Sequence, residues 1–533
     1  MRSRKLMIII IAAVLIILAA CSNKEAGSDV NEEKVANFNK TGFPVVNKPI
    51  TIEFMTGKSP LTSDDYNQVL VWKEYEKMTN IHIDWGLVPN EGLAEKRNIS
   101  LATGKYPEVL YSAGVPNADI LKYGEQGIFL ELSDLIDEHM PNLKRLFEEY
   151  PEIKMGLTFP DGKIYSLPTI YSPDYTSILV VNRPWIKEDW LEQLGMDIPQ
   201  TTDEFYNYLK KVKETDLNGD GSNNEIPFGS TTIATLLYYL NGSFGVGNRG
   251  IRHSFLDMDP ETNELRFYRI SDRYKELLQY VNKLYEEGLI EQNIYSIEEM
   301  QFQATGSEGL YGSSVTSNPE SRWGIEGEYV GMEPLTGPHG DKMHAYIGSP
   351  LSHTGSFIIT DKNKHPEATA RWMDYFYSDE GARLFFMGLK DKTYKEDENG
   401  ELEYVDEITN NPDGKTIQQA QSEYFTWLGG GYPGIVKKDY FKSLPSSLEA
   451  TEKLKPYLID EVWSTFIYTQ EEGKKLLPLE TDIAKYANEM SDKFITGTIS
   501  FEQWDEYVKE IKKLGLDEYM KIQNAAYERY KNS

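Results

Sequence analysis

Most of the chain alternates between two patterns of apolar residues, one typical of strands and one typical of helices. Residues 50–54 (Ile-Thr-Ile-Glu-Phe) and 81–85 (Ile-His-Ile-Asp-Trp) place apolar side chains at every second position, as half-buried strands do. The stretch between them repeats its apolar residues every three or four positions, which predicts a helix: Tyr66, Val69, Leu70, Trp72 and Tyr75. Strands and helices that follow one another at this spacing indicate an α/β fold.

The same alternation continues toward the C-terminus. Short apolar runs predict buried strands at 108–111 and 178–181, and amphipathic spacing predicts a helix at 274–287. Two sequences have the form of a capping box, with Thr or Ser at the first position and Glu or Gln three residues later: 201–204 and 500–503. We expect a helix to begin at each of them.

Residues 1–20 have the features of a secretory signal peptide. Three basic residues near the start precede an unbroken apolar run, 6–18, which is shorter than the roughly 20 residues of a membrane span. The sequence Leu-Ala-Ala-Cys at 18–21 then resembles the bacterial lipobox, in which a diacylglycerol is attached to the cysteine thiol and the signal is cleaved just before it. Cys21 is the only cysteine of the chain, and two or more acyl chains on it would anchor the protein stably. The alternative is an uncleaved anchor with an incidental cysteine.

Composition restricts the possible partners. The polar segment 21–48 predicts a flexible tether, and the 533 residues suffice for more than one domain core. The formal net charge of −29 argues against a nucleic-acid partner, which needs a basic face, and against lying flat on anionic lipid. With Cys21 lipidated, no disulfide can form within the chain.

The loop that follows the helix predicted from residue 201 carries oxygen-bearing side chains at alternate positions. Asp216, Asn218 and Asp220, followed by a glycine, match the start of an EF-hand calcium loop. Position 12 of that loop is Pro227 instead of the usual Glu, so a shorter loop would have to close on its own residues. The expected ligands of a structural Ca²⁺ are Asp216, Asn218, Asp220, Ser222, Asn224 and Glu225. The alternative is a turn that binds nothing, because Asn, Asp and Gly dominate turns.

Other candidate motifs lack the context that their chemistry needs. Residues 245–250 match G-x-G-x-x-G by letters, but no βαβ pattern surrounds them, so we reject a dinucleotide site. His339, His344 and His353 are spaced by 5 and 9 residues, which matches no standard zinc pattern. The sequence shows no nucleophile elbow, P-loop or H-E-x-x-H motif.

Several stretches, taken in order, resemble one bacterial family. Residues 361–368 (Asp-Lys-Asn-Lys-His-Pro-Glu-Ala) and 378–381 (Ser-Asp-Glu-Gly) look like the corresponding helices of family 1 extracellular solute-binding proteins. Further stretches strengthen the resemblance to the long lipoprotein branch found in Bacillus and Paenibacillus relatives, to which alginate-binding receptors are distantly similar: 274–276, 282–289, 494–497, 504–505 and 525–530. That branch carries the shortened calcium loop, and the six residues named above match it one by one.

The resemblance implies a two-lobed α/β fold of the type II periplasmic-binding-protein kind, with the lobes joined by hinge crossings. The expected division places 49–177 and 350–395 in the N-terminal lobe, and 178–349 and 396–533 in the C-terminal lobe. It further implies a monomeric, non-enzymatic protein on the extracellular face of the cell membrane, which binds an oligosaccharide in the interlobe cleft and delivers it to the membrane subunits of an ABC permease. The alternatives are a surface-anchored polysaccharide-degrading enzyme and a carbohydrate-binding adhesin or sensor.

Aromatic residues in loops are the best candidates for sugar contacts. Aromatic faces pack against sugar rings, whereas aromatics at helical spacing, such as Trp72, Trp372 and Trp504, are expected in the core. The candidates lie in loops rich in Pro or Gly: Tyr171, Tyr175, Trp323, Trp427 and Tyr432. Arg183, at the end of a predicted strand, could pair with an acidic sugar or form a structural ion pair.

Overall fold

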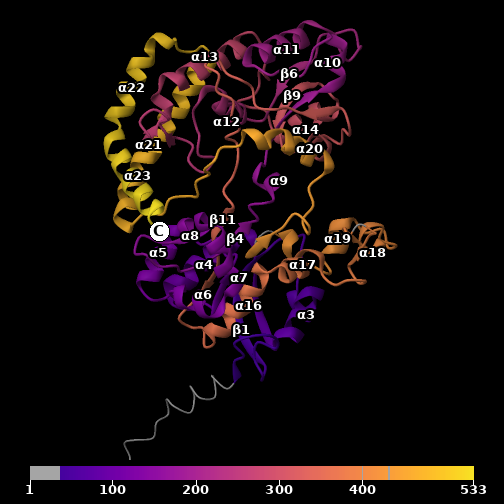
Figure 1. Cartoon of the computed structure of the whole chain (residues 1–533), viewed down its shortest axis with the longest axis vertical. Helices are drawn as coiled ribbons and strands as arrows, with labels where there is room; N and C mark the ends of the chain where they lie inside the picture. Colours follow the sequence, from indigo (N-terminus) through magenta and orange to yellow (C-terminus); the bar gives the residue numbers. More distant parts are fainter. Residues whose placement is uncertain (1–36, 399, 430–431) are drawn as a thin grey trace, which may run out of the picture.

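The computed structural model describes residues 37–398, 400–429 and 432–533. The expected signal peptide and Cys21 lie outside these residues. The described chain forms two lobes, one above the other in Figure 1, and each lobe is built on its own β-sheet. Among the described residues, every helix is too short or too polar to cross a membrane.

The first lobe, the lower one in Figure 1, contains a six-stranded sheet with the strand order β14-β4-β11-β3-β1-β2. Its strands, in chain order, are β1 (Ile50–Lys58), β2 (Ile81–Pro89), β3 (Val109–Tyr111), β4 (Leu167–Tyr171), β11 (Leu351–Ile359) and β14 (Gly434–Val436). Strand β1 runs parallel to β2 and β3, and β11 runs antiparallel to its neighbours β3 and β4. The strands predicted from alternation at 50–54 and 81–85 are therefore confirmed, and they pair with each other.

Helices cover both faces of this sheet. They are α3 (Leu70–Thr79), α4 (Asn90–Thr103), α5 (Asn117–Glu125), α6 (Ser133–His139), α7 (Pro141–Glu149), α8 (Pro151–Leu157), α16 (Pro366–Asp374) and α17 (Asp379–Met387). The predicted core residues Trp72 and Trp372 are buried and stack with ring centroids 5.7 Å apart. This aromatic packing joins α3 to α16, nearly 300 positions later in the chain.

The second lobe contains a four-stranded sheet with the order β10-β5-β9-β6. Its strands are β5 (Arg183–Lys187), β6 (Ile226–Gly229), β9 (Tyr311–Thr316) and β10 (Tyr329–Gly331), and a separate hairpin pairs β7 (Leu256–Met258) with β8 (Leu265–Phe267). Its helices are α10 (Glu188–Leu194), α11 (Thr202–Glu214), α12 (Ile233–Asn241), α13 (Asp272–Glu286), α14 (Glu299–Ser307), α15 (Pro319–Trp323), α20 (Pro445–Leu454), α21 (Gln470–Ile495), α22 (Trp504–Lys513) and α23 (Leu516–Lys531). The long C-terminal helices lie on the left of Figure 1.

The two predicted capping boxes differ in outcome. The Thr201 hydroxyl accepts the Glu204 N–H at 3.1 Å and the Glu204 carboxylate accepts the Thr201 N–H, so the first box is confirmed at the start of α11. Ser500 instead accepts the Glu502 N–H and begins a short 3₁₀ helix, η7 (Phe501–Gln503), and α22 begins only at Trp504. Trp504 is buried in the core, as predicted.

The strand predicted at 178–181 is wrong. The chain leaves β4 for the second lobe through a short helix, α9 (Thr176–Leu179), and the apolar side chains of this crossing pack against Ile347 and Leu454. A run of four apolar residues fits a buried strand or a buried helical turn equally well, and here the packing of the crossing favours the turn.

The sheets also correct the expected division of the chain. Residues 396–436 were expected in the C-terminal lobe, but β14 pairs in parallel with β4, and Ile408 and Phe425 lie in the core of the first lobe. Part of the expected tether is folded as well, since Val45 and Val46 are buried and their N–H groups donate to the Thr79 carbonyl oxygen. A strand of three residues, such as β14, is too short to show an alternation of apolar and polar residues, so the sequence did not predict it.

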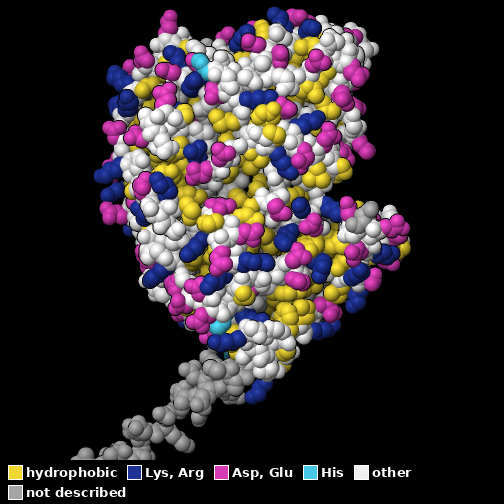
Figure 2. Space-filling view, viewed as in Figure 1, with side chains coloured by type: hydrophobic (Ala, Val, Ile, Leu, Met, Phe, Trp, Pro, Cys, Tyr) yellow, Lys and Arg dark blue, Asp and Glu magenta, His cyan; other side chains and the backbone are white. Residues whose placement is uncertain are grey.

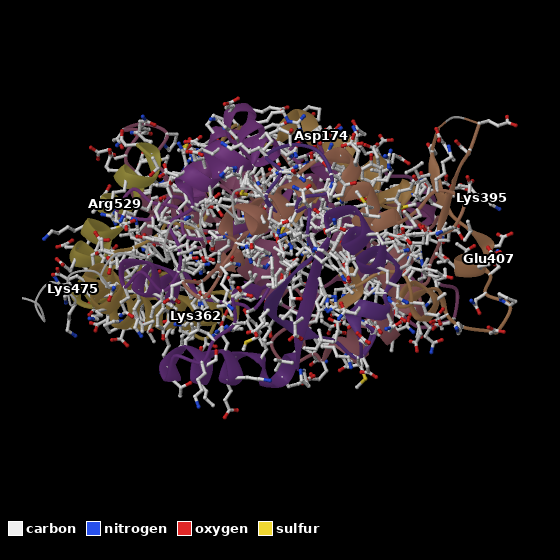
Figure 3. The ribbon with its side chains drawn as sticks, turned by 90° about the horizontal axis from the view of Figure 1, so that it is seen from below. Asp174, Lys362, Lys395, Glu407, Lys475 and Arg529 are labelled. Atoms are coloured by element: carbon white, nitrogen blue, oxygen red, sulfur yellow. The ribbon has the colours of Figure 1, made fainter. Side chains whose placement is uncertain are left out.

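A projection extends from the first lobe. It consists of β12 (Tyr394–Glu396), β13 (Leu402–Tyr404), α18 (Asp406–Thr409) and α19 (Ile417–Gln421). Figure 3 shows Lys395 and Glu407 of this projection at one edge of the molecule, opposite Arg529 of α23. Figure 2 shows an indentation between the projection and the upper lobe.

Candidate functional site

The sheet edge of the first lobe that faces the second lobe carries a cavity. The chain leaves the first lobe at this edge, at the end of β4, and re-enters it at the start of β11. Because β3 runs antiparallel to β11, the carboxyl end of β3 lies at the same edge. The cavity has a volume of about 610 Å³, and its polar lining is formed by Ser112, Asn117, Thr169, Ser352, His353, Thr354, Ser356, Tyr432 and Thr465. Among the described residues that line it there is no Asp, Glu, Lys or Arg. Neutral donors and acceptors of this kind suit an uncharged ligand rich in hydroxyl groups.

Two of the predicted sugar-contacting residues come together beside this cavity. Tyr171 ends β4 and Tyr432 precedes β14, and their hydroxyl oxygens lie 3.3 Å apart. Both side chains are half-buried. Burial raises the pKa of the Tyr432 hydroxyl, so it stays protonated and can donate a hydrogen bond.

One cation from the second lobe reaches the same place. Arg252 lies in the loop between α12 and β7, and its Nη2 donates to the Ser352 carbonyl oxygen of β11 at 2.7 Å. This hydrogen bond of Arg252 joins the two lobes next to the cavity. Sequence reasoning missed it, because nothing in the local pattern of residues 245–252 indicates that this loop lies against β11.

Two of the predicted aromatic contacts are corrected, because their side chains are buried inside the protein. Tyr175 is 2% exposed, and its hydroxyl lies 2.7 Å from the Ser443 Oγ. Trp323 is 4% exposed and packs between Phe302 and Tyr329 in the core of the second lobe. Both residues support the fold and present no face to a ligand in this structure.

Arg183 is also corrected. It is 3% exposed, and its guanidinium donates to neutral groups of the crossing and its surroundings, among them the Thr451 Oγ1 (2.9 Å), the Ser317 carbonyl oxygen (3.1 Å) and the Ser177 Oγ (2.8 Å). Burial lowers the pKa of Arg183 to about 10. Its role is structural, but through hydrogen bonds to neutral groups instead of an ion pair.

Trp427 lies on the first lobe beside the projection. Its ring is half-buried, with centroids 6.0 Å from Phe386 and 5.9 Å from Phe441. No contact among the described residues brings it to the cavity lining, and its role in ligand binding stays a prediction.

Comparison with known proteins decides the family. The family described as bacterial extracellular solute-binding protein matches residues 58–383, more than half of the chain. The chain belongs to this family. It is a family of binding proteins and not of enzymes, so the predicted absence of catalysis is confirmed and the degrading-enzyme alternative falls away.

Two curated relatives match almost the whole of this solute-binding protein. The fructooligosaccharide ABC transporter substrate-binding protein FusA of Streptococcus pneumoniae serotype 4 (strain ATCC BAA-334 / TIGR4) is 31% identical over 96% of each chain. Lipoprotein LipO of Bacillus subtilis (strain 168) is 25% identical, also over 96% of each chain.

Solved structures of FusA from S. pneumoniae confirm the predicted two-lobed fold. The structure in complex with kestose superposes with a TM-score of 0.71 at 27% identity and covers 91% of this chain and 100% of that chain. A FusA EF-hand mutant in complex with fructo-nystose gives a TM-score of 0.69 at 28% identity, with coverages of 91% and 100%. The relatives thus include a protein with an EF-hand, the motif predicted here at residue 216.

The loop at 216–225 is a tight turn whose polar side chains are hydrogen-bonded within the loop. The two carboxylate oxygens of Asp216 accept the N–H groups of Gly219 (2.8 Å) and Gly221 (2.9 Å), and both glycines have the left-handed φ that the sharp turn requires. The side chains of Asn218, Asp220 and Asn224 contact one another, at distances down to 2.8 Å.

Glu225 provides the strongest local sign of a ligand. It is 7% exposed, and its Oε1 accepts the N–H groups of Leu217 (2.7 Å) and Asn218 (2.9 Å), whereas its Oε2 is buried with no hydrogen-bond partner in the described structure. A buried carboxylate oxygen is costly unless something pairs with it. The described residues hold no group of three or more His, Cys, Asp or Glu that could bind a metal by themselves, so amide and carbonyl oxygens would have to complete the site.

The three histidines considered above do not form a metal site. His339 contacts Glu276 at 2.6 Å, His344 is fully buried, and His353 lies in the cavity lining beside the Ser352 hydroxyl. The G-x-G-x-x-G sequence also lacks the helix of a dinucleotide site, because hairpin β7–β8 follows it.

Proposed function

We propose that the protein is the binding component of an ABC importer for neutral oligosaccharides. The observation that carries this proposal is the cavity at the interlobe edge, whose polar lining consists of hydroxyl, amide and imidazole groups. The likeness to FusA over 96% of each chain supports a short oligosaccharide of the fructan type as the ligand. Tyr432 lines the cavity, Tyr171 and Arg252 lie beside it, and all three would contact the sugar.

The proposal extends to the place of action. Cys21 would carry the lipid anchor, and the named lipoprotein among the relatives supports this assignment. A receptor held on the membrane meets the permease at a higher effective concentration than a free one, which favours delivery of the sugar. The partner would be the membrane subunits of that permease, and the receptor would act as a monomer.

Isothermal titration calorimetry with kestose tests the ligand. We expect saturable binding of one kestose per protein with no product formed, and weaker binding of an oligogalacturonate of the same length, because the lining residues carry no cation and Arg252 alone lies beside the cavity. The reverse preference would refute a neutral ligand. No binding of any neutral oligosaccharide up to about 1 mM would refute the proposed function.

We also infer that the loop at 216–225 binds Ca²⁺. Asp216, Asn218, Asp220, Ser222, Asn224 and Glu225 would hold the ion, which would stabilise the start of β6 and perform no chemistry. A ligand at about 100 times its dissociation constant stabilises the folded state by about 2.7 kcal/mol, so chelation should lower the melting temperature clearly.

A matched pair of variants makes the calcium test specific. Asp259, in the turn of hairpin β7–β8, accepts the N–H groups of Glu261 and Thr262 much as Asp216 accepts those of its loop. Chelation should lower the melting temperature of the parent and of Asp259→Asn, but not of Asp216→Asn. Equal melting temperatures of the parent with and without chelator would refute calcium binding.

A further inference from the structure

One residue of the cavity lining has a backbone conformation that its side chain does not favour. Among the described residues, four that are not glycine have φ in the left-handed region: Asn80, Ser112, Asn263 and Asp391. Asn and Asp tolerate this region, whereas for serine it is unusual. Ser112, with φ of 46°, is therefore the exception, and such strain is concentrated at ligand-binding and other functional sites.

The surroundings hold Ser112 firmly in this conformation. It is the first residue after β3, and its N–H donates to the Ser356 carbonyl oxygen of β11 at 2.6 Å. The buried guanidinium of Arg97, from α4, donates to the carbonyl oxygens of the next two residues, Ala113 and Gly114. The turn is thus fixed from both sides, so the strain at Ser112 is built into the edge of the sheet.

The hydroxyl of Ser112 is unpaired among the residues that the structure describes. Its Oγ is buried and has no hydrogen-bond partner in the described structure, although Ser112 lines the cavity. A buried hydroxyl without a hydrogen-bond partner costs free energy, and a ligand hydroxyl in the cavity would provide the missing partner. Neighbouring hydroxyls differ in this respect, since Thr169 and Ser356 lie 2.8 Å apart and are bonded to each other.

We propose that Ser112 is a specificity-determining residue of the cleft, which is held in a strained turn so that its hydroxyl binds a hydroxyl group of the bound oligosaccharide. This inference rests on the proposed function and adds a contact that the sequence pattern did not indicate. The position also agrees with the tendency of ligands to bind at the carboxyl ends of strands in α/β sheets.

Two substitutions separate the hydroxyl from the backbone strain. Ser112→Ala removes the hydroxyl and keeps the strain, and Ser112→Gly removes both. Each should weaken kestose binding by about 3- to 10-fold, the worth of one hydrogen bond between neutral groups. Because glycine adopts a left-handed φ freely, Ser112→Gly should melt no lower than Ser112→Ala. The control Asn263→Gly makes the same backbone change in the distant β7–β8 hairpin and should leave the affinity unchanged.

The outcomes distinguish a failure of the proposed Ser112 contact from a failure of the proposed function. If both Ser112 variants bind kestose within about two-fold of the parent, the contact does not exist, while the proposed function stands. If only one of the two variants weakens binding, the effect belongs to the backbone or to packing, and the role of the hydroxyl is refuted. If the parent binds no oligosaccharide, the proposed function fails and this inference fails with it.

Discussion

Substitution of Arg183 by lysine distinguishes a structural arginine from a ligand-binding one. The sequence left open a contact to an acidic sugar or a structural ion pair, whereas the structure buries the guanidinium between the first crossing, β9 and α20. Lysine keeps the positive charge but presents its donors from a single nitrogen, so it cannot reach three separate acceptors in a planar arrangement. The substitution therefore removes the fork of hydrogen bonds without removing the charge.

The size of the effect follows from the partners that are lost. Arg183 donates to the Thr451 Oγ1, the Ser317 carbonyl oxygen and the Ser177 side chain and carbonyl group. If lysine keeps one or two of these bonds, at least two are lost, and bonds to a charged group contribute about 1.5–3 kcal/mol each. Allowing for some relaxation, we expect a loss of about 3 kcal/mol. For a lobe of this size that corresponds to a melting temperature lower by roughly 6–12 °C.

Thermal unfolding and calorimetry on the same samples provide the test. Arg183→Lys should melt well below the parent and still bind kestose with nearly the parent affinity at a temperature where both are folded. Arg145 is exposed on α7, and Arg145→Lys should change neither quantity. An unchanged melting temperature together with an affinity loss of more than about ten-fold would refute the structural role and restore Arg183 as a ligand contact.

Two further predictions concern stability. A Cβ at Gly337 would lie 1.6 Å from the Ser243 carbonyl oxygen, so in denaturant titrations Gly337→Ala should lower the free energy of unfolding of the second lobe by about 1–3 kcal/mol. The control Gly92→Ala in α4 has open space around the added Cβ and should raise the free energy of unfolding by about 0.5–1 kcal/mol. Burial lowers the pKa of His253, which lies 2.9 Å from the Ser464 carbonyl oxygen, to about 4. Because this pKa lies below the ordinary value of 6.5, stability is lost as the pH falls from 6.5 toward 4, by about 2 kcal/mol at pH 5. Melting curves at pH 7.5 and 5 should show a smaller acid effect in His253→Asn than in the parent.

The sequence predicted elements well where the pattern fits only one kind of element. The alternation at 50–54 and 81–85 lies within β1 and β2, and the capping box at Thr201 begins α11 as expected. It failed where an apolar run fits a strand and a helical turn equally well, and where a strand has only three residues. The apolar run at 178–181 forms a helical turn, and the three-residue strand β14 moved a whole segment into the other lobe.

The candidate site was harder to predict because it is assembled from distant segments. Of the aromatics chosen for lying in loops, Tyr171 and Tyr432 meet beside the cavity, but Tyr175 and Trp323 are buried. Proline and glycine indicate irregular backbone, but they do not indicate that its side chains are accessible, because other parts of the protein can cover a loop. Only the packing of the crossings decides which loop side chains remain accessible, and that packing depends on residues hundreds of positions away.

The net charge of the chain likewise does not predict the charge of the cavity lining. The chain has 84 acidic and 55 basic residues, yet the cavity lining contains neither kind among the described residues, and Arg252 approaches only its edge. The surplus of carboxylates lies on solvated surfaces, where it affects solubility and long-range attraction. Discrimination between a neutral and an acidic sugar depends instead on the few groups that a ligand desolvates. For that reason the affinity for kestose relative to oligogalacturonate tests the local lining, and the −29 charge of the whole chain does not predict its result.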